Sequence, residues 1–130
     1  MTVLDASAAV ELLLNTPRGR RLHARLAADT ETLHAPHLAD LEIAQVLRRY
    51  VLHGNLGEPQ ARLALARWRS LDVERYAHEP LLGRVWGLRN NMSAYDAVYV
   101  ALAEALGTVL VTGDRRLAAA PGLNVHVELA

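Results

Sequence analysis

The sequence predicts an α/β fold with a central parallel sheet that is covered by helices on both faces. Short apolar segments of strand length alternate with longer segments of helical periodicity along all 130 residues, and this alternation is typical of parallel sheets. The strongest strand candidate is Thr108-Val109-Leu110-Val111-Thr112, which is rich in β-branched residues. Right-handed crossovers place the carboxyl ends of all strands at one edge of the sheet, where such sheets bind their ligands.

Apolar runs predict the strands of the amino-terminal half, and apolar residues three or four positions apart predict its helices. Pro17 and Pro36 each mark the start of a helix, and Gly54 marks an end. The expected elements are a strand at 2–4, a helix at 7–14, a helix opened by Pro17 over 18–28, a strand at 32–35, a long helix from Pro36 past Val51 to Gly54, and a helix at 58–71.

The carboxyl-terminal half continues the alternation. Asn90-Asn91 breaks one helix, Ser93 opens the next, and Gly107 ends it. The expected elements are a strand at 73–77, a helix opened by Glu79-Pro80 and reaching Arg89, a helix from Ser93 to Gly107, a strand at 108–112, a short helix after Gly113-Asp114, and a strand at 124–127. No repeat or linker interrupts the chain, so we expect a single domain over residues 1–130.

The composition excludes several classes of protein and of chemistry. No apolar run is long enough to cross a membrane, and the amino terminus is a poor signal peptide, so we expect a cytoplasmic protein. The absence of cysteine excludes disulfides and thiolate chemistry. All 14 basic residues are arginine and the formal net charge is zero, so the chain has no overall basic character and no lysine for Schiff-base chemistry or a P-loop.

Two aspartates are predicted to lie at the functional edge of the sheet. Asp5 and Asp114 each follow a predicted strand, and Asp96 lies in the first turn of a helix that is apolar on nearly every side. We expect burial of that helix to keep the Asp96 carboxylate from open water. Each aspartate also has a simpler interpretation, because Asp5 and Asp114 can cap the helices that follow them and Ser93-x-x-Asp96 resembles a capping box.

Convergence of these carboxylates would require a compensating positive charge. Two carboxylates about 4 Å apart repel by about 4 kcal/mol at an effective dielectric constant of about 20, and the chain has no lysine to offset that repulsion. A hard divalent cation such as Mg²⁺ favours carboxylate oxygens and water as ligands. If the three aspartates converge, the sequence therefore predicts a metal site.

Four segments carry a family resemblance that covers essentially the whole chain. They are Val3-Leu4-Asp5-Ala6-Ser7, Pro36 through Glu42-Ile43 with Leu47-Arg48-Arg49 following, Ser93-Ala94-Tyr95-Asp96-Ala97 leading into Ala101, and Thr112-Gly113-Asp114-Arg115-Arg116-Leu117. In order, spacing and length these segments resemble the PIN-domain ribonucleases, specifically the VapC-type toxins of bacterial toxin–antitoxin pairs. The resemblance implies a three-layer α/β/α fold with a parallel sheet of four or five strands.

The resemblance also implies a site of four acids that bind Mg²⁺ or Mn²⁺, with hydroxyl groups that hold the carboxylates by hydrogen bonds. The acids would be Asp5, Glu42, Asp96 and Asp114, and the hydroxyl residues would be Ser7 and Thr112. Glu42 has an alternative interpretation as a solvated residue on the outer face of its helix. Some family members carry a further acid or amide two places after the fourth acid; Arg116 stands there in this chain, which puts a second metal site in doubt.

The implied activity is that of a metal-dependent endoribonuclease toxin, in which metal-activated water attacks an RNA phosphodiester in line. Asp5 and Asp96 would be direct metal ligands, and Glu42 and Asp114 would bind the metal directly or through water. Arg115 and Arg116 flank the fourth acid, so they would contact RNA unless they form an ordinary solvated face.

The resemblance further implies two protein partners, a cognate VapB-type antitoxin that blocks the acidic pocket and a second copy of the chain in a homodimer. Residues 43–52 and 63–68 are rich in apolar residues and arginine. They could form the homodimer seam, receive an antitoxin helix or belong to the ordinary core.

Two rival protein classes are disfavoured by residues that can be read directly from the sequence. A phosphorylation-receiver domain uses a lysine, which this chain lacks, and a haloacid-dehalogenase-type phosphatase needs Asp-x-Asp where this chain has Asp5-Ala6-Ser7. A PIN-domain nuclease of RNA processing or repair and a non-catalytic PIN-like scaffold remain as alternatives. The scaffold is disfavoured because such domains usually lose one or more acids.

Histidine and tryptophan are expected to have structural roles. His34-x-x-His37 flanks Pro36 at a predicted turn, which disfavours a zinc site. Trp68 and Trp86 lie on amphipathic segments, where core or interface positions are favoured over base stacking.

Overall fold

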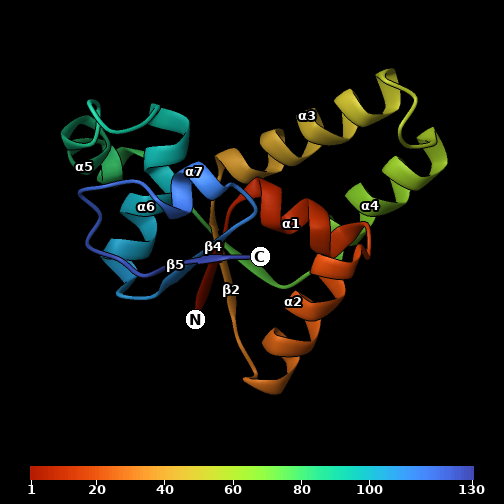
Figure 1. Cartoon of the computed structure of the whole chain (residues 1–130), viewed down its shortest axis with the longest axis horizontal. Coiled ribbons are helices and arrows are strands. Elements are labelled where there is room, and N and C mark those ends of the chain that lie inside the picture. The colour runs from red at the N-terminus through yellow and green to blue at the C-terminus, as the bar shows by residue number, and fades with distance from the viewer.

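A five-stranded sheet forms the centre of the computed structural model, which describes residues 1–130 (Figure 1). Every neighbouring pair of strands is parallel, and the spatial order is β3-β2-β1-β4-β5. The strands are β1 (Thr2–Leu4), β2 (Leu33–Pro36), β3 (Val73–Tyr76), β4 (Val109–Thr112) and β5 (Val127–Leu129). The predicted α/β class with a central parallel sheet is confirmed.

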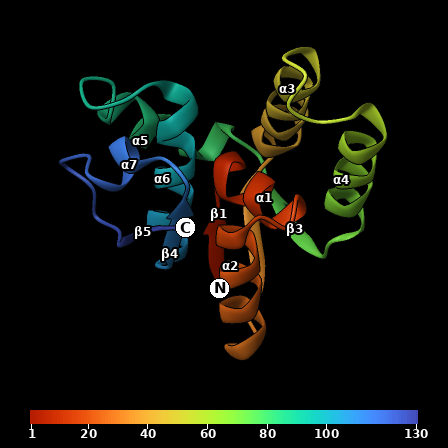
Figure 2. The ribbon, with the colours of Figure 1, turned by 45° about the vertical axis from the view of Figure 1, so that its right-hand side comes forward.

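Helices connect the strands and lie on both sides of the central pair, β1 and β4 (Figures 1 and 2). They are α1 (Ala6–Leu13), α2 (Pro17–Ala28), α3 (Leu38–Leu52), α4 (Glu58–Ser70), the 3₁₀ turn η1 (Glu79–Leu81), α5 (Leu82–Gly87), α6 (Ala94–Leu106) and α7 (Arg115–Ala118). In both views α3 and α4 lie on one side of the central strands, and α5 to α7 lie on the other. None of these helices is both long enough and apolar enough to span a lipid bilayer.

The alternation of side chains along the central strands divides the core into two clusters. Val3 and Leu110 belong to the larger cluster, which contains the buried residues of α6. Their neighbours Leu4 and Val111 belong to a smaller cluster with buried leucines of α2. Successive residues of a strand point to opposite faces, so the sheet is buried on both faces and the layers follow the expected α/β/α order.

Three predicted boundaries are wrong for physical reasons. Pro36 ends β2 instead of opening α3, because it pairs with Tyr76 of β3. The predicted helix over 79–89 is a 3₁₀ turn followed by α5, which ends at Gly87, where the conformational freedom of glycine disfavours continuation. The last strand begins at Val127, opposite Leu110 of β4, and an edge strand of this kind takes its position from its partner.

The remaining element predictions agree with the structure to within one or two residues at each end. Gly107 has a left-handed conformation with φ 64° and caps the carboxyl end of α6, so its predicted role as a helix terminator is confirmed. This boundary matters for the site, because α6 carries Asp96 in its first turn and ends directly before β4.

Candidate active site

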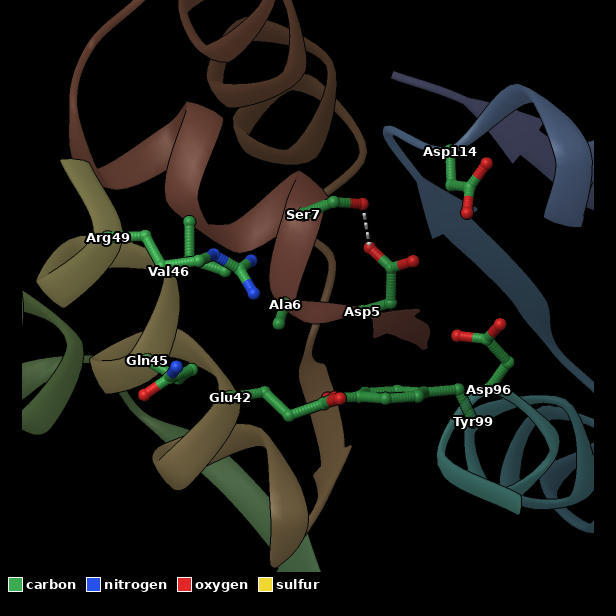
Figure 3. A pocket seen from close by; sticks show the side chains of 10 residues that line it. All are labelled: Asp5, Ala6, Ser7, Glu42, Gln45, Val46, Arg49, Asp96, Tyr99 and Asp114. Carbon is green, nitrogen blue, oxygen red and sulfur yellow. Dashed lines mark hydrogen bonds between the residues drawn. The ribbon is translucent and has the colours of Figure 1, made fainter. Parts of the chain in front are cut away.

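The carboxyl ends of β1 and β4, the second and third turns of α3 and the first two turns of α6 surround one pocket of about 200 Å³ (Figure 3). All four acids predicted from the sequence line it, namely Asp5, Glu42, Asp96 and Asp114, together with Ala6, Ser7, Gln45, Val46, Arg49 and Tyr99. Parallel strands and right-handed connections explain the convergence, since they bring the residue after each strand to the same edge.

Asp5 is the most buried of the four acids, with 7% of its surface exposed. Its Oδ1 accepts hydrogen bonds from Ser7 Oγ at 2.7 Å and from the backbone N–H of Ala8 at 3.0 Å. Its Oδ2 accepts a hydrogen bond from the hydroxyl of Thr112. The bond from Ala8 confirms the capping interpretation of Asp5, and the remaining bonds fix the carboxylate toward the pocket.

Ser7 and Thr112 join the two loops that carry Asp5 and Asp114. Besides donating to Asp5, Ser7 Oγ accepts from the backbone N–H of Gly113 at 2.8 Å, and Thr112 Oγ1 accepts from the backbone N–H of Asp114 at 3.0 Å. A Cβ at Gly113 would lie 3.1 Å from Ser7 Oγ, so glycine permits this close approach. The two hydroxyls therefore occupy the supporting positions that the sequence predicted for them.

Asp114 caps the short helix α7 and also lines the pocket. Its Oδ1 accepts a hydrogen bond from the backbone N–H of Arg116 at 2.8 Å, which confirms the capping interpretation. The guanidinium Nε of Arg116 lies 3.8 Å from the same oxygen, and that side chain is 93% exposed. Arg115 is also exposed but does not line the pocket.

Asp96 is half-buried at the start of α6, and its carboxylate points toward those of Asp5 and Asp114 (Figure 3). Ser93 caps the helix, since its Oγ accepts from the backbone N–H of Asp96 at 3.2 Å. The expectation that the whole helix is enclosed is wrong for its first turn, where Tyr95 is 63% exposed. Burial on every side applies only to the run from Ala97 to Ala103.

Glu42 is also half-buried, and it faces the pocket from α3 rather than the solvent. Its Oε1 accepts a hydrogen bond of 2.5 Å from the hydroxyl of Tyr99, a residue of α6 that is 2% exposed. The interpretation of Glu42 as a solvated outer residue is therefore wrong. The bond links the two helices that face each other across the pocket (Figure 3).

Two residues of the pocket, Tyr99 and Arg49, were not predicted from the sequence. A usable signal existed for Tyr99, because a tyrosine inside an apolar helix normally finds a hydrogen-bond partner for its hydroxyl. Arg49 lies two turns after Glu42 on α3 and forms no ion pair. Amphipathic spacing alone did not distinguish Arg49 from other exposed arginines.

The electrostatics of the pocket reflect the crowding of like charges. Burial raises the pKa of the Asp5 carboxyl, and the nearby Asp114 raises it further. Burial also raises the pKa values of Glu42 and Asp96, and neighbouring aspartates add to both shifts. The pKa of Tyr99 is raised as well, first by burial and then by its bond to Glu42. Removal of water and mutual repulsion thus both disfavour the charged carboxylates.

The donor set suits a hard divalent cation. It consists of carboxylate oxygens with no histidine or thiolate, and carboxylate oxygens are the side-chain ligands that Mg²⁺ and Mn²⁺ prefer. As the side chains stand, no three of them lie close enough to share one ion. Mg²⁺ is commonly bound through one or two carboxylates and keeps several waters, so the pocket fits such an ion.

His34, one of the discounted histidine pair, and Trp68 have structural roles, as expected, whereas His37 is exposed. His34 is buried between Thr32 and Tyr76, which lie at hydrogen-bond distances of 2.9 and 2.7 Å. Trp68 is 1% exposed and donates to Asp40 at 2.7 Å. Trp86 differs, because it is 69% exposed beneath the guanidinium of Arg89 and is not a core residue.

Comparison with known proteins gives a consistent result. The family model of the PIN domain matches residues 2–123. The chain is 52% identical over 117 residues to VapC ribonuclease Mb0985 of Mycobacterium bovis, covering 90% of this chain and 88% of that protein. It is 44% identical to ribonuclease VapC1 of Mycobacterium tuberculosis, covering 98% and 96%. The fold also matches the crystal structure of VapBC2 from Rickettsia felis bound to a DNA fragment from their promoter, with a TM-score of 0.71, 16% identity and coverage of 99% and 98%.

Proposed function

This chain belongs to the PIN-domain family, among its VapC ribonucleases, and from that premise we propose that the acidic pocket is the catalytic site of a divalent-metal-dependent ribonuclease toxin. The ribonuclease and toxin assignments follow from the family. The metal, the RNA substrate and the roles of individual residues are our proposal. The observation that carries it is the gathering of four carboxylates in one pocket, whose one ion pair is the 3.8 Å contact between Arg116 and Asp114.

Asp5 and Asp96 would be direct ligands of the metal ion. Asp5 is held by three donors and still faces the pocket, and Asp96 points toward it from α6 (Figure 3). Glu42 and Asp114 would bind the same ion directly or through water. Such an ion would supply charge neutralisation at a phosphate oxygen and a lowered pKa for water. Mg²⁺ is our first choice, and Mn²⁺ takes the same ligands.

The chain's own residues would then position the reacting groups. Ser7 and Thr112 fix the Asp5 carboxylate, and Tyr99 holds that of Glu42 toward α6. Either Glu42 or Asp114 would orient the attacking water by accepting its proton in a hydrogen bond. Phosphodiester hydrolysis suits a carboxylate cluster of this kind better than acyl transfer does, because no histidine or cysteine lines the pocket to activate or supply a nucleophile.

Positive charge at the rim would draw the RNA backbone to a pocket that is itself negative. Arg116 is exposed beside Asp114 and also lines a neighbouring polar pocket with Asn91 and Ser93. A guanidinium of this kind can bind phosphate through two parallel hydrogen bonds. Arg115 lies next to it and would make a weaker contact, since it lines neither pocket.

A VapB-type antitoxin would inhibit the enzyme by covering the acidic pocket. The Rickettsia felis neighbour is a VapBC pair, and an apolar groove between α3 and α4 offers a place for a partner helix. Leu47, Val51 and Leu65 line that groove. We propose it as the antitoxin seat, and the homodimer as the state of the free toxin. We also propose that the protein acts in the cytoplasm, because that is where its proposed RNA substrates occur.

Cleavage of purified RNA tests the proposal. The protein should cut RNA in Mg²⁺, leave 5′-phosphate and 3′-hydroxyl ends, and stop when EDTA is added. Asp96→Asn should lower the rate at least about 100-fold, because it removes one charge from the metal site. A panel of tRNA, rRNA and mRNA would identify the substrate class. Undiminished cutting in EDTA, or by Asp96→Asn, would exclude the metal mechanism.

A further inference from the structure

A second groove adjoins the acidic pocket where the outer face of α3 meets the first turn of α6. We call it the α3–α6 groove. It has a volume of about 710 Å³ and shares Glu42, Gln45 and Arg49 with the acidic pocket. Tyr95, Leu41 and Arg48 line the part that lies outside that pocket. Its size is that of a small-molecule site, and its continuity with the pocket makes it a route for a bound chain.

The groove exposes two large apolar side chains beside the proposed catalytic acids. Tyr95 is 63% exposed and Leu41 is 72% exposed. Tyr95 lies one turn before Tyr99 on α6, so both tyrosines face α3. The hydroxyl of Tyr99 is engaged in its hydrogen bond to Glu42. Tyr95, which directly precedes Asp96 in the sequence, has an exposed ring.

The same groove carries two guanidinium groups, those of Arg48 and Arg49, and the charge of Arg49 partly offsets the raised pKa of Glu42. Arg48 and Arg49 are exposed on α3 and form no ion pair. Other arginines without an ion pair, such as Arg69 and Arg115, lie outside this groove. An aromatic face next to unpaired guanidinium groups is the combination that binds single-stranded nucleic acid, through base stacking and phosphate contacts.

We propose that the α3–α6 groove is a nucleotide subsite, in which the base next to the scissile phosphate stacks on Tyr95 and its phosphate contacts Arg48 and Arg49. The inference rests on the proposed ribonuclease function. The polar pocket around Arg116 lies on the other side of Asp96 and Asp114, so the bound strand would cross the acids between the two flanking sites. Charge decides the choice of occupant, because the adjacent guanidinium groups of Arg48 and Arg49 attract the phosphates of an RNA backbone and would repel the same groups of a second copy.

Binding of a short single-stranded RNA in Mg²⁺ tests the subsite, with Asp5→Asn as the non-cleaving parent. Fluorescence anisotropy should show that Tyr95→Ala weakens binding about 5- to 100-fold, whereas Tyr95→Phe binds like the parent. Tyr50→Ala is the matched control, since Tyr50 is exposed on α3 outside the groove, and it should change nothing. Equal binding by the Tyr95→Ala variant would overturn the subsite.

Two further measurements distinguish RNA binding in the groove from a misfolded variant and from a subunit interface at the same place. Arg48→Gln should reduce the slope of log affinity against log salt concentration by about 0.7, and Arg69→Gln, an exposed arginine of α4 outside the groove, should not. Light scattering should give the same oligomeric mass for the Tyr95→Ala variant and its parent. A change of mass with unchanged RNA binding would assign the groove to a second copy instead. A parent that binds no RNA would overturn the ribonuclease proposal itself.

Discussion

Hydroxyl groups decide how the carboxylates of the pocket are held. Asp5 accepts from Ser7 and Thr112, and Glu42 accepts from Tyr99. Each donor offsets part of the burial that raises the pKa of its carboxyl. Hydrogen bonds to an ion-binding carboxylate fix its direction, and their loss typically weakens metal binding or activity 10- to 100-fold.

Tyr99→Phe should therefore lower the affinity for Mn²⁺ and the RNA cleavage rate by about 10-fold each, while the fold remains intact. The ring stays in the core and only the donor to Glu42 is lost. Metal titration and cleavage kinetics measure the two effects. Tyr50→Phe removes a hydroxyl from the exposed tyrosine of α3 and should change neither. Unaltered metal affinity in Tyr99→Phe would show that Glu42 does not depend on this bond.

The aspartates could be predicted from the sequence more directly than Glu42. Asp5 and Asp114 follow strands, and Asp96 interrupts an apolar helix, so spacing alone singled them out. Glu42 lies on an amphipathic helix, where nothing local distinguishes it from a solvated acid. Only the family resemblance selected it, and only the packing of α3 against α6 reveals Tyr99 as its partner.

At the scale of elements, the site depends on two loops that approach each other after β1 and β4. Across them, Ser7 Oγ accepts from the backbone N–H of Gly113, whose lack of a Cβ permits the contact, and Thr112 Oγ1 donates to Asp5. The parallel direction of the strands could be predicted, and with it the shared edge at which they end. The ends of β2, α5 and β5 could not be predicted. For β2 and β5 the reason is that Pro36 and Val127 take their positions from partner strands that are distant in sequence.

Thr112→Val should reduce the free energy of unfolding by about 1–3 kcal/mol. The substitution keeps the shape of a fully buried residue but leaves Asp5 without one donor and the Asp114 N–H without its acceptor. Urea unfolding measures the loss. Thr112→Ser retains the hydroxyl and should recover most of the stability. Equal loss in both variants would attribute the effect to packing rather than to hydrogen bonding.

At the scale of the whole molecule, a chain with zero formal net charge concentrates negative charge at one edge of its sheet. The raised pKa values of Asp5, Glu42 and Asp96 mean that the folded state binds these protons more tightly than the unfolded state. Without a divalent ion, their contribution to stability therefore falls as pH rises from about 4 through the raised values. Glu31 and Glu104 have lowered pKa values and act in the opposite sense, below about pH 4.5.

In EDTA the wild-type protein should accordingly have a higher Tm at pH 4.5, close to the ordinary pKa of these carboxyls, than at pH 7.5. Asp96→Asn should raise the Tm at pH 7.5 by about 3 °C, equivalent to about 1 kcal/mol for a chain of this size, because it removes one of the repelling charges. The variant should also show a smaller pH dependence. Differential scanning calorimetry at both pH values measures these shifts. A wild-type Tm that rises with pH would contradict the raised pKa values.

The most direct test of the central claim is a calorimetric titration of the purified protein with Mn²⁺. Four carboxylates of one pocket should give saturable binding that Asp96→Asn weakens at least about 10-fold. The control Asp72→Asn removes an exposed acid that does not line the pocket and should leave the binding unchanged. Equal binding by the wild type and Asp96→Asn, or no saturable binding by either, would contradict a metal site in this pocket.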